Sequence, residues 1–159
     1  MQNLKSVRLL IGERGHKPTR DRIESTFDTT VASRSALTNL ERHERAAISA
    51  IATLSMPVDR QLIDQLPGLE IIASFGVGYD HVDAAYAASK GICVTHTPHV
   101  LDDEVADTTI ALLLNTVREF YAAEKHLRDG HWDKEGNYPL TPLSMRGRVV
   151  GIFGLGRIG

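Results

Sequence analysis

Short apolar runs rich in β-branched residues alternate with amphipathic stretches along the first hundred residues of the chain. Such runs are typical of buried strands, and the stretches between them have the periodicity of helices. The predicted strands cover Val7 to Gly12, Thr29 to Ser33, Ala46 to Leu54, Leu69 to Gly78, and Ile92 to Pro98. Strands that alternate with helices predict right-handed crossovers and a parallel sheet. The predicted fold class is therefore α/β, with a flavodoxin-like five-stranded sheet in the order 2-1-3-4-5.

The pattern changes at Asp102, because residues 102–129 contain neither proline nor glycine. Acidic residues begin this stretch and basic residues end it, an arrangement that suits the dipole of a helix. The sequence predicts one long helix here. Its centre, "TTIALLLNTV", is apolar around most of its circumference. We therefore expect it to be buried on several sides, against its own sheet, a second domain or a partner subunit.

A glycine motif follows the apolar run "RVVGIF", which is itself a predicted strand. Gly154, Gly156 and Gly159 have the G-x-G-x-x-G spacing of a dinucleotide-binding turn. In that motif the first glycine makes the turn, the second admits the pyrophosphate and the third packs a helix on the strand. Arg157 and Ile158 are then expected nearest the phosphates. The helix and the ribose-binding acid that complete such a site would lie beyond residue 159.

A second glycine pair lies in "SFGVGYDHVD", where the fourth predicted strand ends. Gly76 and Gly78 flank Val77, and adjacent backbone N–H groups at such a turn can bind an anion such as a carboxylate. The alternative is an ordinary tight turn from strand to helix. Asp80 is a plausible N-cap and Asp83 a plausible first-turn acid of the following helix.

The segment "HTPHVLDDEVADTT" carries several polar side chains. We interpret its histidines and first acids as a loop with helix caps, and we predict no metal site. Thr108 and Thr109 lie in the second turn of the long helix. Each hydroxyl could donate to a cofactor phosphate or bond to its own backbone.

Composition excludes some partners. The chain has 18 Lys and Arg residues against 20 Asp and Glu residues, a net charge of −2. This balance does not favour nucleic acid or an anionic membrane. No apolar run approaches the roughly 18 residues of a membrane span, and the start lacks a signal-peptide core, so we expect a cytoplasmic protein. The single cysteine, Cys93, lies in a strand-like run and is expected to be buried and inert.

Four segments together resemble the D-isomer-specific 2-hydroxyacid dehydrogenase family, and most closely its glyoxylate/hydroxypyruvate reductase branch. They lie in order within residues 45–159 and read "LEIIASFGVGYDHVD", "KGICVTHTPHVLDDEVADTTIALLLNTVREF", "LRDGHW" and "MRGRVVGIFGLGRIG". The first 45 residues match the family only in their alternation of strand and helix.

The resemblance implies three parts: an N-terminal portion of the substrate domain over 1–98, a connector and dimerisation helix over 99–132, and the start of a truncated dinucleotide-binding domain over 147–159. It implies that Val77 and Gly78 offer N–H groups to the carboxylate of a small 2-oxo or 2-hydroxy acid. It also implies that Thr108 faces NAD or NADP, and that the protein forms a homodimer through the long helix.

The family's reaction passes a hydride from the nicotinamide to the carbonyl carbon of a 2-oxo acid. The Arg, Glu and His that serve this reaction in the family lie C-terminal to the glycine motif, so no catalytic residue is assigned here. We expect residues 1–159 alone to be inactive, as the N-terminal part of a longer enzyme. The alternatives are a dimerisation or protein-binding module without catalysis, and a stand-alone domain that binds small acids.

Overall fold

The computed structural model describes residues 4–13, 15–31, 33 and 37–159. The chain divides into two compact units, the first ending at Val100 and the second spanning Leu101–Gly159. Each unit is described by itself.

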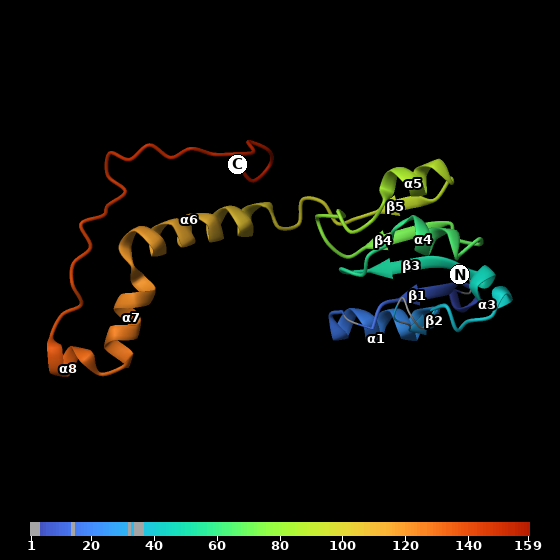
Figure 1. Ribbon diagram of the computed structural model, residues 1–159, viewed down its shortest axis with the longest axis horizontal. Coiled ribbons are helices and arrows are strands. Elements are labelled where there is room, and N and C mark those ends of the chain that lie inside the picture. The colour runs from blue at the N-terminus through green and yellow to red at the C-terminus, as the bar shows by residue number, and fades with distance from the viewer. Residues whose placement is uncertain (1–3, 14, 32, 34–36) are drawn as a thin grey trace. The chain divides into compact units, whose positions relative to one another are not determined.

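The first unit is built on a five-stranded sheet (Figure 1). Its strands are β1 (Arg8–Ile11), β2 (Asp28–Val31), β3 (Ile48–Thr53), β4 (Ile71–Ser74) and β5 (Cys93–Thr95). Every neighbouring pair is parallel, and the order is β2-β1-β3-β4-β5. The predicted α/β class and strand order are therefore confirmed. Parallel strands place all their carboxyl ends at one edge, where ligands of such sheets bind.

Helices of the first unit follow the strands in the expected alternation. They are the short 3₁₀ helix η1 (Leu4–Ser6) and the helices α1 (Lys17–Thr26), α3 (Arg42–Ala47), α4 (Arg60–Asp64) and α5 (Ala84–Ser89). The Asp59 carboxylate accepts a hydrogen bond from the N–H of Leu62 at 3.0 Å and so caps α4. Asp83, rather than the expected Asp80, caps α5 by accepting from the N–H of Tyr86 at 3.0 Å. The helix begins this late because Val82 forms a parallel bridge with Val58.

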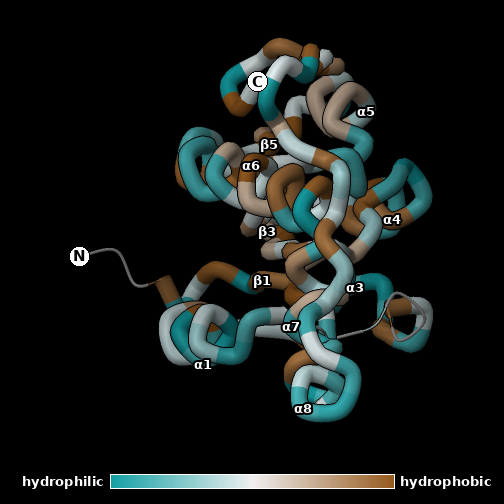
Figure 2. Tube along the Cα trace, turned by 90° about the vertical axis from the view of Figure 1, so that its left-hand side faces the viewer, coloured by the Kyte–Doolittle hydropathy of each residue, from teal (hydrophilic) through white to brown (hydrophobic). Residues whose placement is uncertain are grey.

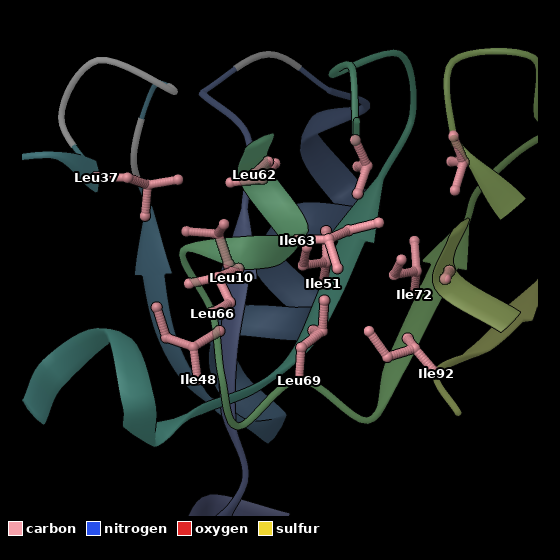
Figure 3. Packing of buried hydrophobic residues seen from close by; sticks show 13 residues of the cluster. Leu10, Leu37, Ile48, Ile51, Leu62, Ile63, Leu66, Leu69, Ile72 and Ile92 are labelled. Carbon is pink, nitrogen blue, oxygen red and sulfur yellow. The ribbon is translucent and has the colours of Figure 1, made fainter. Parts of the chain in front are cut away.

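Apolar side chains pack on both faces of the sheet. On one face the strands meet α4 and α5 in a cluster of buried residues that includes Leu10, Ile51, Leu62 and Ile72 (Figure 3). On the other face Leu9, Ile11 and Ala50 pack against Ile23 and Phe27, at α1 and just after it. Figure 2 shows β1 and β3 as strongly hydrophobic segments, as burial on both faces requires.

Cys93 is exposed, so the expectation of a buried thiol is wrong. Within the part of the chain that the structure describes, β5 is an edge strand that pairs only with β4. Ile92, just before it, is buried, whereas Cys93 and Thr95 are exposed. An apolar run in the sequence does not show whether its strand is central or at an edge.

The second unit contains α6 (Asp102–Arg118), α7 (Phe120–Arg128) and α8 (His131–Glu135). The prediction of one helix over 99–132 is therefore wrong, and Figure 1 shows the change of direction after α6. Glu119 has the left-handed conformation, with φ of 55°. The side-chain oxygen of Asn115 accepts from the N–H of Tyr121 at 3.1 Å, which supports a new helix start at that point. In the described part of the chain, no helix combines the length and apolar character needed to cross a bilayer.

Residues 147–159 form no strand in the structure, in contrast to the expected first strand of a dinucleotide-binding domain. A strand needs a neighbour to receive its backbone hydrogen bonds, and no described strand pairs with this segment. Val149 and Phe153 are correspondingly exposed to solvent.

Candidate functional site

The turn that follows β4 is held at its start by the neighbouring strands. The N–H of Phe75 donates to the carbonyl oxygen of Thr53 at 2.7 Å. The N–H of Thr97 donates to the carbonyl of Gly76 at 2.9 Å. The side chain of His96, just after β5, donates from Nδ1 to the carbonyl oxygen of Val77 at 2.8 Å.

The far end of the same turn is fixed by the segment before α4. The N–H of Val58 donates to the carbonyl oxygen of His81 at 2.8 Å, and the N–H of Asp83 donates to that of Val58 at 2.9 Å. The turn is therefore anchored on both sides, which keeps its backbone groups in fixed directions.

Several N–H groups of this turn donate no hydrogen bond within the described chain, and two of them are consecutive at the glycine pair. Within the described residues, neither Val77 nor Gly78 donates from its backbone N–H. Val77 is half-buried and Gly78 is exposed. Gly76 and Gly78 both lack a positive φ, so neither is needed for a left-handed backbone. Their N–H groups are available to an external acceptor such as a carboxylate.

One negative charge lies close to these groups. A Cβ atom added at Gly78 would lie 3.4 Å from Oδ2 of Asp80. Among the described residues, Asp80 has no hydrogen-bond or ion-pair partner. Its negative charge therefore repels an anion bound at the turn, and its carboxylate makes no stabilising contact with the described residues.

A small open hollow of about 50 Å³ lies beside Phe75 at the same edge of the sheet. It is lined mainly by the loop after β1, the start of α1 and the end of β3. The rings of His16 and Phe75 stack in it with centroids 6.4 Å apart. Arg20 also lines it, but its Nε binds Glu24 at 2.6 Å and its Nη1 donates to the carbonyl oxygen of Glu13 at 3.0 Å. The basic charge in the hollow is thus already partly neutralised.

The two adjacent threonines in the second turn of α6 behave differently. Thr109 donates its hydroxyl to the carbonyl oxygen of Val105 at 2.7 Å, the local alternative that the sequence left open. Thr108 is exposed, and its hydroxyl has no partner within the described part of the chain. Of the pair, Thr108 is the one that can donate to a ligand.

The glycine motif adopts a turn even without a strand before it. Gly154 has a φ of +91°, a conformation that glycine reaches without strain. A Cβ at Gly159 would lie 2.7 Å from the carbonyl oxygen of Gly154, whereas one at Gly156 would meet no atom within 4 Å. Arg157 donates from Nε to the carboxylate of Asp102 at 3.1 Å, and Ile158 is exposed.

No group of three or more potential metal ligands gathers in the residues that the structure describes. His96 instead serves the backbone of the turn, which sequence reasoning did not foresee. The signal was available, since Val77 and His96 follow two strands that the predicted order places side by side. The ring of Tyr79 adds an edge-on contact to His96, with centroids 4.9 Å apart.

Comparisons with known proteins place the chain in a family. Residues 9–146 match the model of the D-isomer-specific 2-hydroxyacid dehydrogenase catalytic domain. The chain is 41% identical over 121 residues to a glyoxylate reductase of Thermofilum pendens, covering 76% of this chain and 36% of that protein. It is 43% identical over 120 residues to a glyoxylate/hydroxypyruvate reductase of Arabidopsis thaliana, covering 76% and 38%.

A solved structure is similar over nearly the whole chain. The NADPH-dependent glyoxylate/hydroxypyruvate reductase of Sinorhizobium meliloti, in complex with NADP and malonate, superposes with a TM-score of 0.86 at 46% identity. The match covers 97% of this chain and 48% of that one. The chain thus spans between about a third and a half of the length of these relatives. The chain belongs to the D-isomer-specific 2-hydroxyacid dehydrogenase family.

Proposed function

We propose that this chain is part of an NAD(P)-dependent oxidoreductase that reduces small 2-oxo acids, of the glyoxylate and hydroxypyruvate type, to D-2-hydroxy acids. The pair of unbonded N–H groups at Val77 and Gly78 is the observation that carries the proposal. They lie at the carboxyl edge of a parallel sheet, and their two donors match the two oxygens of a carboxylate. The reductase of S. meliloti, solved with the dicarboxylate malonate, supports this assignment.

The cofactor-binding part of the proposal assigns Thr108, Gly154, Gly156, Arg157, Ile158 and Gly159 to NAD or NADP. The residues fit a pyrophosphate, because open space at Gly156 lets a ligand approach the backbone and Gly159 admits no side chain. Thr108 offers an unused hydroxyl. The nicotinamide, when bound, supplies the hydride. The residues of this chain bind and orient the cofactor.

In this proposal the general acid and the carbonyl-polarising cation come from residues other than these 159. Arg118 and Arg128 lie exposed on helices of the second unit. Arg128 binds Glu124 at 2.7 Å and His131 binds Glu135 at 2.7 Å, each on its own helix. We therefore expect residues 1–159 by themselves to turn over neither glyoxylate nor hydroxypyruvate.

A homodimer through α6 is a further part of the proposal. Ile110 and Leu114 of this helix are 57% and 39% exposed, and they lie one turn apart on the same side of it. Exposed apolar side chains of this size are typical of an interface. The same observation favours the alternative, an assembly module without catalysis.

Expression of the complete reading frame that contains these residues tests the proposal. We expect oxidation of NADPH or NADH that depends on glyoxylate or hydroxypyruvate. Formation of a dimer with no turnover of either acid would favour the assembly module instead.

Two substitutions connect the activity to the proposed sites. Asp80→Asn removes the charge beside the turn, so the KM for glyoxylate should fall by about threefold. Thr108→Val should raise the KM for the nicotinamide several-fold and leave that for glyoxylate unchanged. An unchanged KM for both ligands in both variants would contradict these site assignments.

A further inference from the structure

Two successive peptide units make up the proposed carboxylate-binding turn. The first joins Gly76 to Val77, and the second joins Val77 to Gly78. In a planar trans peptide the C=O and N–H groups point in opposite directions. Fixing the carbonyl of Gly76 therefore aims the N–H of Val77, and fixing the carbonyl of Val77 aims the N–H of Gly78.

Both carbonyls are held by consecutive residues just after β5. Thr97 binds the first through its backbone N–H at 2.9 Å, and His96 binds the second through its imidazole at 2.8 Å. Neither of the two N–H groups on the opposite edges of these peptide units donates a hydrogen bond within the described chain. The segment just after β5 thus orients both proposed donors.

We propose that His96 is a positioning residue for substrate binding, which holds the Val77–Gly78 peptide so that the N–H of Gly78 faces the carboxylate of the 2-oxo acid. This inference rests on the proposed function. Glycines on both sides of Val77 give the turn the widest backbone freedom. Its orientation must therefore come from outside the turn, and His96 is the side chain that supplies it.

The chemistry of the contact defines the role of the ring. A carbonyl oxygen only accepts, so Nδ1 of His96 carries the hydrogen, and Nε2 is left out of this bond. A hydrogen bond to the carbonyl also polarises the peptide, which makes its N–H a better donor. The half-buried ring is kept in place by the edge contact with Tyr79.

Three variants of the complete reading frame test the role. His96→Ala removes the donor. His96→Asn restores it, because the amide nitrogen of Asn lies where Nδ1 lies in histidine. His43→Ala is the matched control, since His43 is an exposed histidine of α3 whose ring binds Glu41 at 3.2 Å.

The measurements are KM and kcat for glyoxylate, the Kd for malonate, and the amide NMR signal of Gly78. We expect His96→Ala to raise KM and Kd by about tenfold, the scale of one net hydrogen bond. The kcat should stay within about twofold, as for a loss of uniform binding. His96→Asn should return both constants to within about threefold of the wild type, and His43→Ala should leave them unchanged.

The outcomes separate the two proposals. If malonate shifts the Gly78 amide and His96→Ala binds it as tightly as the wild type, the positioning role is wrong and the proposed function stands. The role is equally contradicted if His96→Asn is as impaired as His96→Ala, since packing of the ring would then explain the loss. If malonate leaves the Val77 and Gly78 amides of the wild type unshifted, the proposed carboxylate site itself is wrong, and the inference falls with it.

Discussion

Gly68 lies where two segments of the first unit approach too closely for a side chain. A Cβ atom at this position would lie 2.2 Å from the carbonyl oxygen of Ala46, at the end of α3. The backbone before β3 cannot retreat without disturbing Ile48, which is fully buried. The glycine is therefore required for packing, since its φ is not in the left-handed region.

Gly68→Ala should lower the free energy of unfolding by about 2 kcal/mol, the usual cost of an inserted methyl group with no space to occupy. Urea denaturation followed by circular dichroism measures it. Gly15→Ala is the control, because a Cβ there meets no atom within 4 Å. Equal stability of the two variants would contradict the close approach.

Asp83 combines a helix cap with an ion pair. Its carboxylate binds Nε of Arg60 at 2.9 Å and the N–H of Tyr86 at 3.0 Å. The hydrogen bond from Arg60, followed by that from Tyr86, lowers the pKa of Asp83 below its usual value of 3.8. A lowered pKa in the folded state gives stability that is present above the unfolded pKa and is lost as the pH falls through the folded one.

Asp83→Asn should therefore reduce the acid sensitivity of the fold while keeping the cap, because Asn and Asp cap helices about equally well. The variant should lose less stability than the wild type between about pH 6 and about pH 3.5. Asp83→Ala should be less stable than Asp83→Asn at both values, since it loses the cap as well. Urea midpoints at the two pH values give both comparisons, and parallel pH profiles of wild type and Asp83→Asn would rule out the linkage.

The candidate site was only partly predictable from its residues. Glycine spacing at the end of an apolar run indicated the backbone of Val77 and Gly78. His96 can support the turn only because β4 and β5 are neighbours and end at the same level of the sheet. No local sequence motif encodes that alignment. Asp80 was expected as a helix cap, and the bridge between Val58 and Val82 delayed the helix start to Asp83.

At the level of elements, the β-branched apolar runs predicted the strands well. A strand that is buried on both faces consists almost entirely of apolar residues, which makes it visible in the sequence. The boundary between α3 and β3 was harder, since Ala46 and Ala47 suit either structure. It is decided by a capping box, in which Glu44 accepts from the N–H of Glu41 at 2.9 Å and starts a helix that ends at Ala47. The break at Glu119 was missed because neither glycine nor proline marks it.

The break between α6 and α7 depends on Asn115. Its side chain binds the N–H of Tyr121, which would otherwise be unpaired in the first turn of α7. Asn115→Ala should speed hydrogen exchange of the Tyr121 amide by about fivefold, the scale of a lost helix cap. Thr116→Ala is the neighbouring control, because the Thr116 hydroxyl bonds only to the carbonyl of Leu112 within α6. Unchanged exchange in Asn115→Ala would mean that Glu119 sets the break without this cap.

At the level of the whole molecule, the two units differ in how they bury apolar side chains. The first has clusters on both faces of its sheet, whereas Val117 is the one buried apolar residue among the described residues of the second. Leaving the other apolar side chains of the second unit in contact with water is unfavourable unless another surface covers them. The sequence pattern of α6 indicated this need, and the proposed dimer supplies one such surface.

Two glutamates on α6 test that dimer in the protein encoded by the complete reading frame. Burying a leucine or isoleucine contributes about 1.5–3 kcal/mol, and a carboxylate in its place opposes burial. The double variant Ile110→Glu/Leu114→Glu should therefore raise the dimer dissociation constant more than about a thousandfold. Light scattering should show a dimer for the wild type and a monomer for this variant. Lys134→Glu changes the net charge by the same amount at an exposed residue of α8 and should remain dimeric, so a dimer in all three proteins would place the interface elsewhere.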